Sequence, residues 1–420
     1  ARHDENARVL LVTFSDILAN ALRQRLVRLI ASNPKLSERI EVHSMESLGL
    51  RLFKQYRIEK GLIPEKELYA YLFEAAKNVP DHGFFFSFIQ SEWSEVVDAW
   101  NIADWERYRD IPRLGRKIRL PEARRKTLWS IFALVRDRLE KENLITNSGM
   151  FAILADLVAE RKHPPYEYVV VDEAQDISVS QLRFLASFGT DVPNRLMFCG
   201  DTGQRIFRQG FSWKALGVEI RGRATTLTVN YRTSHQIRRR ADLLLDREVH
   251  DADGNPEDRS TTVSVFNGPE PLIKICKTRD EEKDTVLSWI ETLLKEGLAP
   301  HEICICVRSN EQMQRAHEVA VESGLKFNVL DDHMATVTGK LVLCTMHLAK
   351  GLEFRAVAVM ACDEGIIPLE ERLSDISDSS DLEDVYTTER QLLYVACTRA
   401  RDFLLISSGG EPSEFVRDLI

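Results

Sequence analysis

Residues 168–176 read YVVVDEAQD, an apolar run that is followed at once by two acids. A short, wholly apolar run that ends in polar groups is typical of a strand buried on both faces of a parallel sheet. Residues 195–201, RLMFCGD, repeat this form after a helical stretch. The two runs predict a doubly wound α/β sheet that carries Asp172, Glu173 and Asp201 along one edge.

The flanking sequence extends this pattern in both directions. Residues 7–13 form a β-type run, residues 16–30 place apolar side chains at helical spacing, and residues 40–43 are a short strand candidate. A similar series begins after Asn230 and predicts a second α/β domain. Its expected strands and helices are 272–276, 280–295, 303–307, 311–323, 341–345 and 356–360.

The region between these blocks is mainly helical, and we interpret it as an insertion. The predicted organisation is a first domain at 1–46 and 161–225, a helical insertion at 47–160 and a second domain at 226–420. Residues 370–390 carry eight acids against two arginines, so we expect a solvated, mobile excursion there.

Composition narrows the class of protein without deciding its partner. With 420 residues, 44% of them hydrophobic and 29% charged, the chain can build two or three cores and is not a disordered or fibrous protein. No apolar run approaches a membrane span and the start lacks the order of a signal peptide, so we expect a cytoplasmic protein without a membrane partner.

Charge and cysteine content argue against several further classes of protein. Seven cysteines, an odd number in apolar runs, favour neither a disulfide framework nor a zinc site. The net charge of -9 argues against a protein that coats polyanions. Nine Lys/Arg against three acids in residues 105–126 nevertheless offer a local track for phosphates, unless they form a solvated helix face.

The two acids after the strand at 168–171 suggest a chemistry. One carboxylate can hold Mg²⁺ through its water shell while the next polarises a water beside a nucleoside triphosphate. The alternative is an acidic strand end without chemistry. In GDTGQ, residues 200–204, the Gln204 carboxamide follows another strand at the same edge, where it could sense a γ-phosphate and its water.

Four more blocks complete an ordered set. They are TFSDILANALRQRL at 13–26, LTVNYRTSHQI at 227–237, LCTMHLAKGLEF at 343–354 and ERQLLYVACTRAR at 389–401. Together with VVVDEAQD and GDTGQRIF, the series resembles the motifs of UvrD/Rep-like superfamily 1 helicases in their family order. The resemblance implies two RecA-like domains and an ATP-dependent DNA helicase or translocase that moves 3′ to 5′ on single-stranded DNA.

The resemblance also assigns catalytic roles. Asp172 matches the acid that holds Mg²⁺, and Glu173 matches the general base that activates water. Gln204 matches the glutamine that couples the γ-phosphate to the DNA track. Arg232 and Arg399 match two arginines that reach the γ-phosphate from the second domain, where a guanidinium stays charged and binds phosphate oxygens in a fork.

The expected cofactors are ATP and Mg²⁺, and the resemblance names residues for the nucleoside. Tyr231 matches an aromatic that stacks on adenine, although a core tyrosine is the alternative. Glu353, close to Gly351 in the motif KGLEF, matches the acid that bonds the ribose hydroxyl, and a surface salt bridge is its alternative.

Six residues match family contacts with single-stranded DNA, or DNA with a single-stranded tail. They are Thr13, Phe14, His43, Phe207, Thr345 and His347. Phe207 is the strongest candidate because an aromatic ring can stack on any base. The family often has a Trp two residues after this position, whereas this chain has Gln209, with Trp213 further on, which puts the usual stacking pair in doubt.

Two departures from the family pattern limit the prediction. The phosphate loop GxxxxGK[ST] does not occur, since the one GK, at Gly339 and Lys340, is followed by Leu341. We expect the loop to precede residue 1 in a longer chain, and a degenerate ATPase is the alternative. Residues 324–343 also leave no room for the family's large second insertion, which favours a bare translocase core.

Two further hypotheses stay open from the sequence. The chain could be a helicase-like scaffold that binds DNA or a nuclease or repair partner without hydrolysing ATP. It could also be a helicase that acts on RNA. The sequence before residue 1 distinguishes the scaffold from the motor, and competition between single-stranded DNA and RNA distinguishes the two substrates.

Overall fold

The computed structural model describes residues 7–31, 33–111, 120–161, 163–189, 194–201, 204, 216, 218, 223, 225–245, 248–250, 256–258, 262–331, 337–374 and 379–420. These fall into two compact units. The first holds the described residues up to Asp201 with Leu216, Val218 and Arg223, and the second holds Gln204 and the described residues from Thr225 onward. Each unit is built on a parallel sheet, which confirms the predicted α/β class with two parallel-sheet domains.

The sheet of the first unit consists of four parallel strands in the order β2-β1-β5-β6. Their bounds are β1 (Val9–Thr13), β2 (Ile40–Ser44), β5 (Tyr168–Val171) and β6 (Leu196–Phe198). Val12 lies opposite both His43 and Val171, and Val171 lies opposite Phe198. The residues that follow β1, β5 and β6 therefore emerge at one edge.

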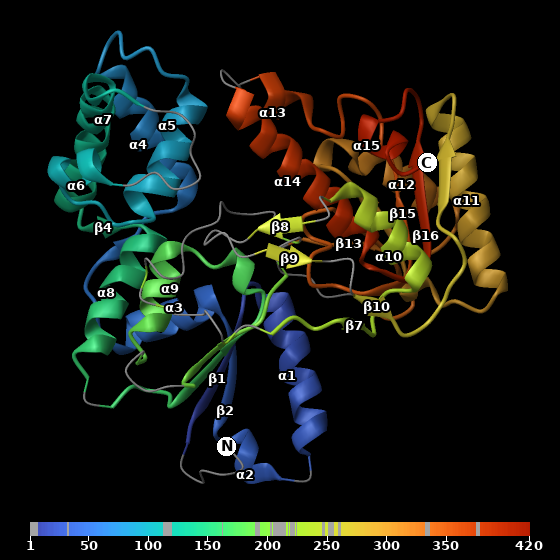
Figure 1. Ribbon diagram of the computed structural model, residues 1–420, viewed down its shortest axis with the longest axis horizontal. Helices are drawn as coiled ribbons and strands as arrows, with labels where there is room; N and C mark the ends of the chain where they lie inside the picture. Colours follow the sequence, from blue (N-terminus) through green and yellow to red (C-terminus); the bar gives the residue numbers. More distant parts are fainter. Residues whose placement is uncertain are drawn as a thin grey trace. The chain divides into compact units, whose positions relative to one another are not determined.

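Alternating side chains give this sheet two different faces. Leu10, Val12, Val169 and Val171 are buried in a core with α3 (Met45–Gln55), α8 (Asn147–Ala159) and α9 (Val179–Ala186). Helix α1 (Asp16–Ile30) packs against β1 and β2 (Figure 1). It begins at Ser15, whose hydroxyl accepts a hydrogen bond from the Leu18 N–H at 3.3 Å, as an N-cap should.

The insertion has a core of its own and is mainly helical, as predicted. Within this core, the Tyr108 hydroxyl donates to the buried Glu92 carboxylate at 2.7 Å. Its elements are β3 (Gly61–Leu62), α4 (Glu65–Lys77), α5 (Phe86–Glu92), the π-helix η1 (Trp93–Asp98), α6 (Trp105–Asp110), α7 (Glu122–Lys141) and β4 (Leu144–Ile145).

The second unit contains a six-stranded parallel sheet in the order β11-β16-β15-β12-β14-β13. The strands are β11 (Leu272–Ile275), β12 (Ile303–Val307), β13 (Phe327–Val329), β14 (Leu341–Thr345), β15 (Phe354–Val359) and β16 (Ala400–Ser408). The central strands β12 and β14 are buried throughout, which explains their continuous apolar sequences.

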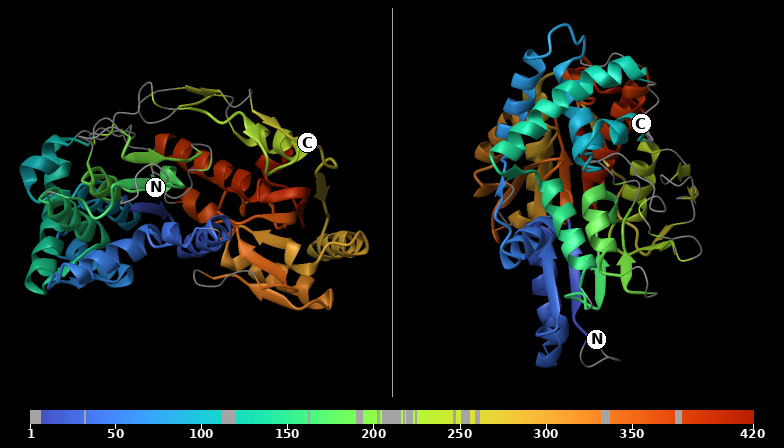
Figure 2. Two further views of the ribbon diagram at one scale, coloured as in Figure 1. Left: turned by 90° about the horizontal axis from the view of Figure 1, so that it is seen from below. Right: turned by 90° about the vertical axis from the view of Figure 1, so that its left-hand side faces the viewer.

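Helices cover both faces of this sheet (Figure 2). One core joins it to α11 (Arg279–Lys295) and α12 (Met313–Glu322). The other joins it to α10 (His235–Ala241), α14 (Ser379–Cys397) and α15 (Glu414–Arg417). The remaining elements are α2 (Pro34–Ser37), η2 (Ala174–Asp176), β7 (Val229–Asn230), η5 (Asp242–Leu244), β8 (Glu248–His250), β9 (Pro256–Asp258), β10 (Val263–Ser264), η7 (Pro300–Glu302), η8 (Asn310–Gln312) and α13 (Glu370–Ser374).

The expectation of a solvated excursion at residues 370–390 is wrong where the structure describes it. Residues 370–374 form α13, and α14 begins at Ser379. Glu389 is fully buried because Arg308 and Arg372 neutralise its carboxylate. No helix within the described ranges is long and apolar enough to cross a membrane.

Candidate functional site

The first part of the candidate site is the carboxyl edge of the four-stranded sheet. The Asp172 N–H donates to the Val12 carbonyl and the Cys199 N–H donates to the Val171 carbonyl, both at 2.8 Å. The Ala174 N–H then donates to the Cys199 carbonyl at 2.9 Å. These bonds hold the residues after β1, β5 and β6 side by side, as the sequence predicts for acids that follow parallel strands.

Glu173 has an unusual backbone conformation. Its φ of 54° and ψ of 42° lie in the left-handed region, which a residue with a Cβ adopts rarely and at a cost of about 1–3 kcal/mol. The conformation ends β5 abruptly and starts the turn η2. The Gln175 amide donates to the Glu173 carboxylate. A strained residue with a carboxylate held by a neighbour is a common feature of functional sites.

Gln175 also organises the other side of this edge, a role that the sequence did not reveal. Its Oε1 accepts the Asp201 N–H at 3.1 Å. Gly200 makes this approach possible, because a Cβ there would lie 2.5 Å from the same Oε1. Gln175 is visible in the sequence as the glutamine of DEAQD, but only the fold shows that its side chain accepts a hydrogen bond from the Asp201 backbone.

The donors at this edge fit a magnesium ion that arrives with its nucleotide. Mg²⁺ is usually bound through one or two carboxylates, with water and substrate phosphates completing six ligands. Asp172 and Glu173 supply such carboxylates. Burial and the charge of Asp172 raise the pKa of the Cys199 thiol, so it stays protonated and is a poor ligand. Among the described residues, no group of three His, Cys, Asp or Glu side chains could hold a metal ion by itself.

The second part of the candidate site lies in the second unit, around the turn before β15. Asn230 Oδ1 accepts the N–H groups of Arg232 at 2.8 Å and Thr233 at 3.2 Å, and this local turn fixes the backbone of Arg232. The guanidinium donates to the Leu352 carbonyl, and its Nε lies 2.8 Å from Glu353 Oε1. Arg232 and Glu353 therefore form an ion pair.

Arg399, which follows α14, is almost completely buried at 1% exposure. Its Nε donates to the Val395 carbonyl at 3.0 Å and its Nη2 donates to Gln204 Oε1 at 2.7 Å. Its carbonyl accepts the Phe354 N–H at 3.0 Å. The two predicted arginines thus lie at the same turn, and the structure brings Gln204 to one of them.

Lys350 is a further member of this site that the sequence analysis missed. Its ammonium donates to the Gln204 carbonyl. Gln204 falls within the predicted first domain at 161–225, yet its contacts group it with the second unit. Because these two bonds to Gln204 come from cations, the charges of Lys350 and Arg399 help to position it.

The two predicted nucleoside contacts near this turn have different surroundings. The Tyr231 side chain is 75% exposed and is not a core tyrosine, so its ring is available for stacking. Gly351 has a φ of 81°, which glycine adopts without strain. Both features agree with the roles predicted for them, which stay predictions.

The predicted DNA contacts of the first unit cluster at its carboxyl edge. Thr13 ends β1, and within the described part of the chain its buried hydroxyl has no hydrogen-bond partner. Phe14 follows it and is half-buried. His43 Nε2 lies 3.2 Å from Glu41 Oε2, and burial, with the charge of Arg51, lowers the pKa of His43.

The contacts predicted in the second unit lie after β14. Thr345 is buried, and its hydroxyl accepts the Leu348 N–H at 3.4 Å. Burial and the nearby charge of Arg308 lower the pKa of His347 to about 4, so this imidazole is neutral at physiological pH. His347 would therefore contact a nucleic acid as a neutral group.

Other predicted nucleic-acid contacts lie outside the described residues. These are Phe207 and residues 112–119 of the basic stretch; Gln209 and Trp213, where the chain departs from the family's stacking pair, also lie outside the described residues. In the described remainder of that stretch, Arg109 pairs with Asp110 at 2.7 Å. Arg125 donates to the Arg109 carbonyl, so part of the local charge has structural partners.

Comparison with known proteins identifies the class. Residues 1–212 match the UvrD/REP helicase N-terminal domain, and residues 325–410 match the UvrD-like helicase C-terminal domain. With its two parallel-sheet units, the chain has the architecture of a RecA-like helicase. The chain belongs to the UvrD/REP family of DNA helicases.

Curated relatives agree with this assignment. The chain is 24% identical to a protein of Mycoplasma pneumoniae named "Probable DNA helicase", over 97% of this chain and 77% of the relative. It is 23% identical to the ATP-dependent DNA helicase UvrD2 of Mycobacterium tuberculosis, over 60% of this chain and 48% of that protein. The second match thus spans about half of the mycobacterial protein.

A solved structure also matches part of the chain. It is the C-terminal domain of a possible DNA helicase from Lactobacillus plantarum, at 19% identity, with 46% of this chain and 94% of that one covered. The TM-score is 0.32, so this match adds nothing to the fold described above.

Proposed function

We propose that the chain is the core of an ATP-dependent DNA motor, which couples ATP hydrolysis to 3′ to 5′ movement on single-stranded DNA. The observation that carries the proposal is the gathering of Arg232, Arg399 and Gln204 at the turn before β15. These groups can stabilise negative charge on a phosphate.

The residues of the first unit would activate the water that attacks ATP. In the proposed reaction, the water oxygen forms a bond to the γ-phosphorus while the bond from that phosphorus to the bridging oxygen of ADP breaks. Glu173 accepts the proton of the water, and inorganic phosphate and ADP leave. Bound Mg²⁺, held by Asp172 and the phosphates, would offset the charge on the phosphate oxygens.

The arginines of the second unit would act on the same phosphate. Charge develops on the γ-phosphate oxygens as the bond to ADP breaks, and a guanidinium that stabilises it accelerates hydrolysis by about 10³–10⁵-fold in GTPases. Tyr231 would stack on the adenine, and Glu353, next to Gly351, would accept a hydrogen bond from the ribose. A site built from both units would form only when they close on ATP.

A phosphate-binding loop would have to be supplied by polypeptide outside the described residues. Among the described strands, β6 lies at an edge of the sheet, and we propose that the strand of this loop lies beside it. Across the sheet, Val42, Leu11, Val170 and Met197 are aligned by the strand register. Val42 is 4% exposed, whereas Met197 on β6 is 59% exposed. An additional strand and helix beside β6 would cover Met197, which supports the expected longer chain.

DNA would cross the carboxyl edges of both sheets. Thr13, Phe14 and His43 lie at that edge in the first unit, and Thr345 and His347 lie after β14 in the second. Hydroxyl groups, backbone amides and neutral imidazoles contact DNA without selecting a sequence. This agrees with a motor that moves along any single strand. We propose DNA rather than RNA as the substrate because the curated relatives are named DNA helicases.

ATP hydrolysis by the intact protein, measured with and without a single-stranded oligonucleotide, tests the proposal. We expect DNA to stimulate turnover, and Glu173→Gln to lower it by about 10²–10⁴-fold because the general base is lost. Glu160→Gln, an exposed acid of the same unit, is the matched control and should leave turnover unchanged.

The alternative functions, a scaffold or an RNA helicase, predict different results in the same measurements. DNA binding without any hydrolysis would show the scaffold rather than the motor. Stronger stimulation by RNA than by DNA of the same sequence would show an RNA helicase. Micromolar binding of ATP to residues 1–420 alone, measured by titration calorimetry, would contradict the expected need for a further phosphate loop.

A further inference from the structure

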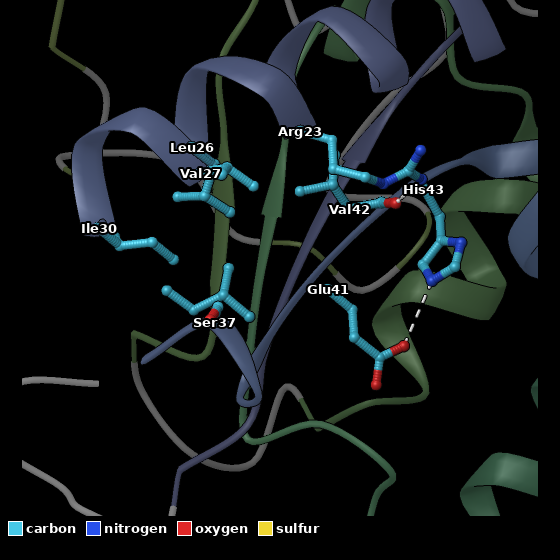
Figure 3. Close-up of a pocket in the computed structure, with 9 residues that line it drawn as sticks. Arg23, Leu26, Val27, Ile30, Ser37, Glu41, Val42 and His43 are labelled. Atoms are coloured by element: carbon cyan, nitrogen blue, oxygen red, sulfur yellow. Dashed lines mark hydrogen bonds and ion pairs between the residues drawn. The ribbon is translucent and has the colours of Figure 1, made fainter. Parts of the chain in front are cut away.

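A groove on the first unit shares one residue, His43, with the proposed DNA contacts and none with the proposed ATP site. It is formed by α1 and the edge strand β2, and it encloses a cavity of about 310 Å³. Aliphatic side chains supply most of its lining: Leu26, Val27, Ile30, Ile40 and Val42 (Figure 3). Val27 is 58% exposed, which is unusual for a valine that lies next to a sheet.

The strand at this groove has an open edge. β2 pairs with β1 and with no other described strand. The Arg39 carbonyl accepts the Val9 N–H at 2.8 Å, so in this parallel ladder the backbone groups of Ile40 and Val42 face the groove. Arg23 donates to the Val42 carbonyl at 2.6 Å and occupies one of these acceptors (Figure 3). Such an edge can accept another strand.

The segment at residues 20–40, which forms much of the groove, is positively charged, in contrast to the whole chain, and of its cations Arg23 lines the groove. Residues 20–40 contain five cations and one acid, Glu38, for a net charge of +4 in a chain of -9. The acid at the groove, Glu41, is already compensated, since it forms ion pairs with Arg8 at 2.6 Å and Arg51 at 2.5 Å. An acidic ligand would therefore be favoured at the rim.

The lining distinguishes a peptide from a nucleic acid. Bases are held mainly by aromatic rings on which they stack, whereas this groove presents five aliphatic side chains and one imidazole, His43, beside an unpaired strand edge. Main-chain hydrogen bonds at an edge, with alternate side chains in apolar pockets, are how extended peptides bind proteins. The groove thus fits a peptide strand better than DNA.

We propose that a short, extended, acidic segment of a partner protein binds here as an added strand beside β2. Its alternate aliphatic side chains would pack between Val27 and Ile40, and its carboxylates would face the arginines of α1 and Lys35 of α2. The added strand would displace Arg23 from the Val42 carbonyl. The proposal does not depend on the motor function, because the groove lies within one unit and uses none of the nucleotide residues.

The size of β2 limits the affinity. The strand has five residues, of which Ile40, Val42 and Ser44 turn their backbone groups outward. A segment of about five residues can therefore be paired, and we expect a dissociation constant on the order of 10 μM for it. Binding should weaken as salt increases, since charge supplies part of it.

A defined peptide tests the proposal. The probe is a dye-labelled heptapeptide that alternates acidic residues with valine, and its binding to the protein is followed by fluorescence polarisation. Val27→Asp should weaken binding at least tenfold by placing a like charge in the groove. Leu29→Asp is the matched control, because Leu29 is 80% exposed on the same helix and does not line the groove. It should change binding less than twofold, and circular dichroism should show both variants folded.

Hydrogen exchange locates the bound peptide. Saturating peptide should slow exchange at residues 40–44, and a peptide with lysines in place of its acids should neither bind nor protect. The proposal is overturned if the acidic peptide binds more weakly than about 1 mM, or if Leu29→Asp weakens it as much as Val27→Asp. Protection elsewhere on the chain would also overturn it. Displacement of the peptide by an equal concentration of oligothymidine would assign the groove to nucleic acid instead.

Discussion

Replacing Arg308 by methionine should destabilise the second unit by about 3 kcal/mol. Arg308 follows β12, and its Nε and Nη2 donate to the two oxygens of Glu389 on α14 at 2.7 and 2.5 Å. Their side chains are only 5% and 0% exposed. Burial alone would raise the pKa of Glu389, but the hydrogen bond and charge of Arg308 lower it, so the carboxylate is ionised.

The size of the expected destabilisation follows from the interactions that Glu389 keeps when Arg308 is replaced. Loss of one partner from a buried ion pair costs about 3–5 kcal/mol, because a charge is left without compensation. Arg372 still contacts the carboxylate at 2.8 Å, which favours the lower end of that range. Arg372→Met should cost about 1 kcal/mol or less, since that side chain is 38% exposed. Removing both charges in Arg308→Met/Glu389→Leu should restore most of the loss.

Hydrogen exchange of the β12 amides is the appropriate assay. It reports the opening free energy of this strand separately from the unfolding of the other unit. A loss of less than 1 kcal/mol for Arg308→Met would refute the reasoning about burial. Failure of the double replacement to recover stability would show that the pair has a role beyond compensating its own charges.

Four further predictions concern the two units. Arg399→Ala should abolish DNA-stimulated ATP hydrolysis in the intact protein while DNA binding is retained, and turnover above a tenth of the original would remove Arg399 from the mechanism. Asp172→Asn should raise the magnesium concentration needed for half-maximal hydrolysis at least tenfold, and an unchanged requirement would exclude it as a ligand. Tyr231→Ala should raise the KM for ATP several-fold with little change in kcat, and a similar rise for GTP would argue against stacking on adenine. Burial and the charge of Arg308 lower the pKa of His347 to about 4, so the unfolded state binds the proton first, and the second unit should lose about 2–3 kcal/mol of stability as pH falls from about 6.5 to 4. His347→Asn should remove that part of the pH dependence, measured by hydrogen exchange of the β14 amides. An unaltered dependence of stability on pH would contradict this prediction.

Much of the fold could be predicted because apolar periodicity marks its central strands. The runs at β5, β12 and β14 are short and apolar, and helix α1 matches its predicted range of 16–30. Strand β16 was missed, since ARDFLLISS begins with charged residues and its apolar part is only four residues long. The strand is stabilised by neighbours on both sides, β11 and β15, which a local pattern cannot reveal.

The contrast between local sequence patterns and contacts made only in the fold also separates the site residues that could be predicted from those that could not. Asp172 and Glu173 were predicted because acids after an apolar strand are visible in the sequence. Gln175 and Lys350 were missed because their importance lies in the backbone groups that they meet, Asp201 N–H and the Gln204 carbonyl. Glu389 was misplaced for a related reason.

An acidic stretch reads as a solvated surface when its counter-ions are distant in the sequence. Arg308 lies far from Glu389 along the chain, and only the packing of α14 against the sheet brings them together. A charge count over residues 370–390 assigns the same weight to a buried acid and an exposed one. The error therefore comes from averaging over a helix that has one buried face.

The two arginines at the turn before β15 are held in different ways, and this difference suggests different tasks. Arg399 is buried and bonded to the Val395 carbonyl and to Gln204, so moving it would leave buried polar groups unpaired. Arg232 and Glu353 have side chains that are 32% and 41% exposed, and an ion pair at such a position contributes about 1 kcal/mol or less. A ribose hydroxyl that competes for Glu353 would therefore release Arg232 from this ion pair at little cost, although its hydrogen bond to the Leu352 carbonyl would still have to break. In the proposed motor, Arg399 would be the fixed part of the site, and Arg232 would move when nucleotide arrives.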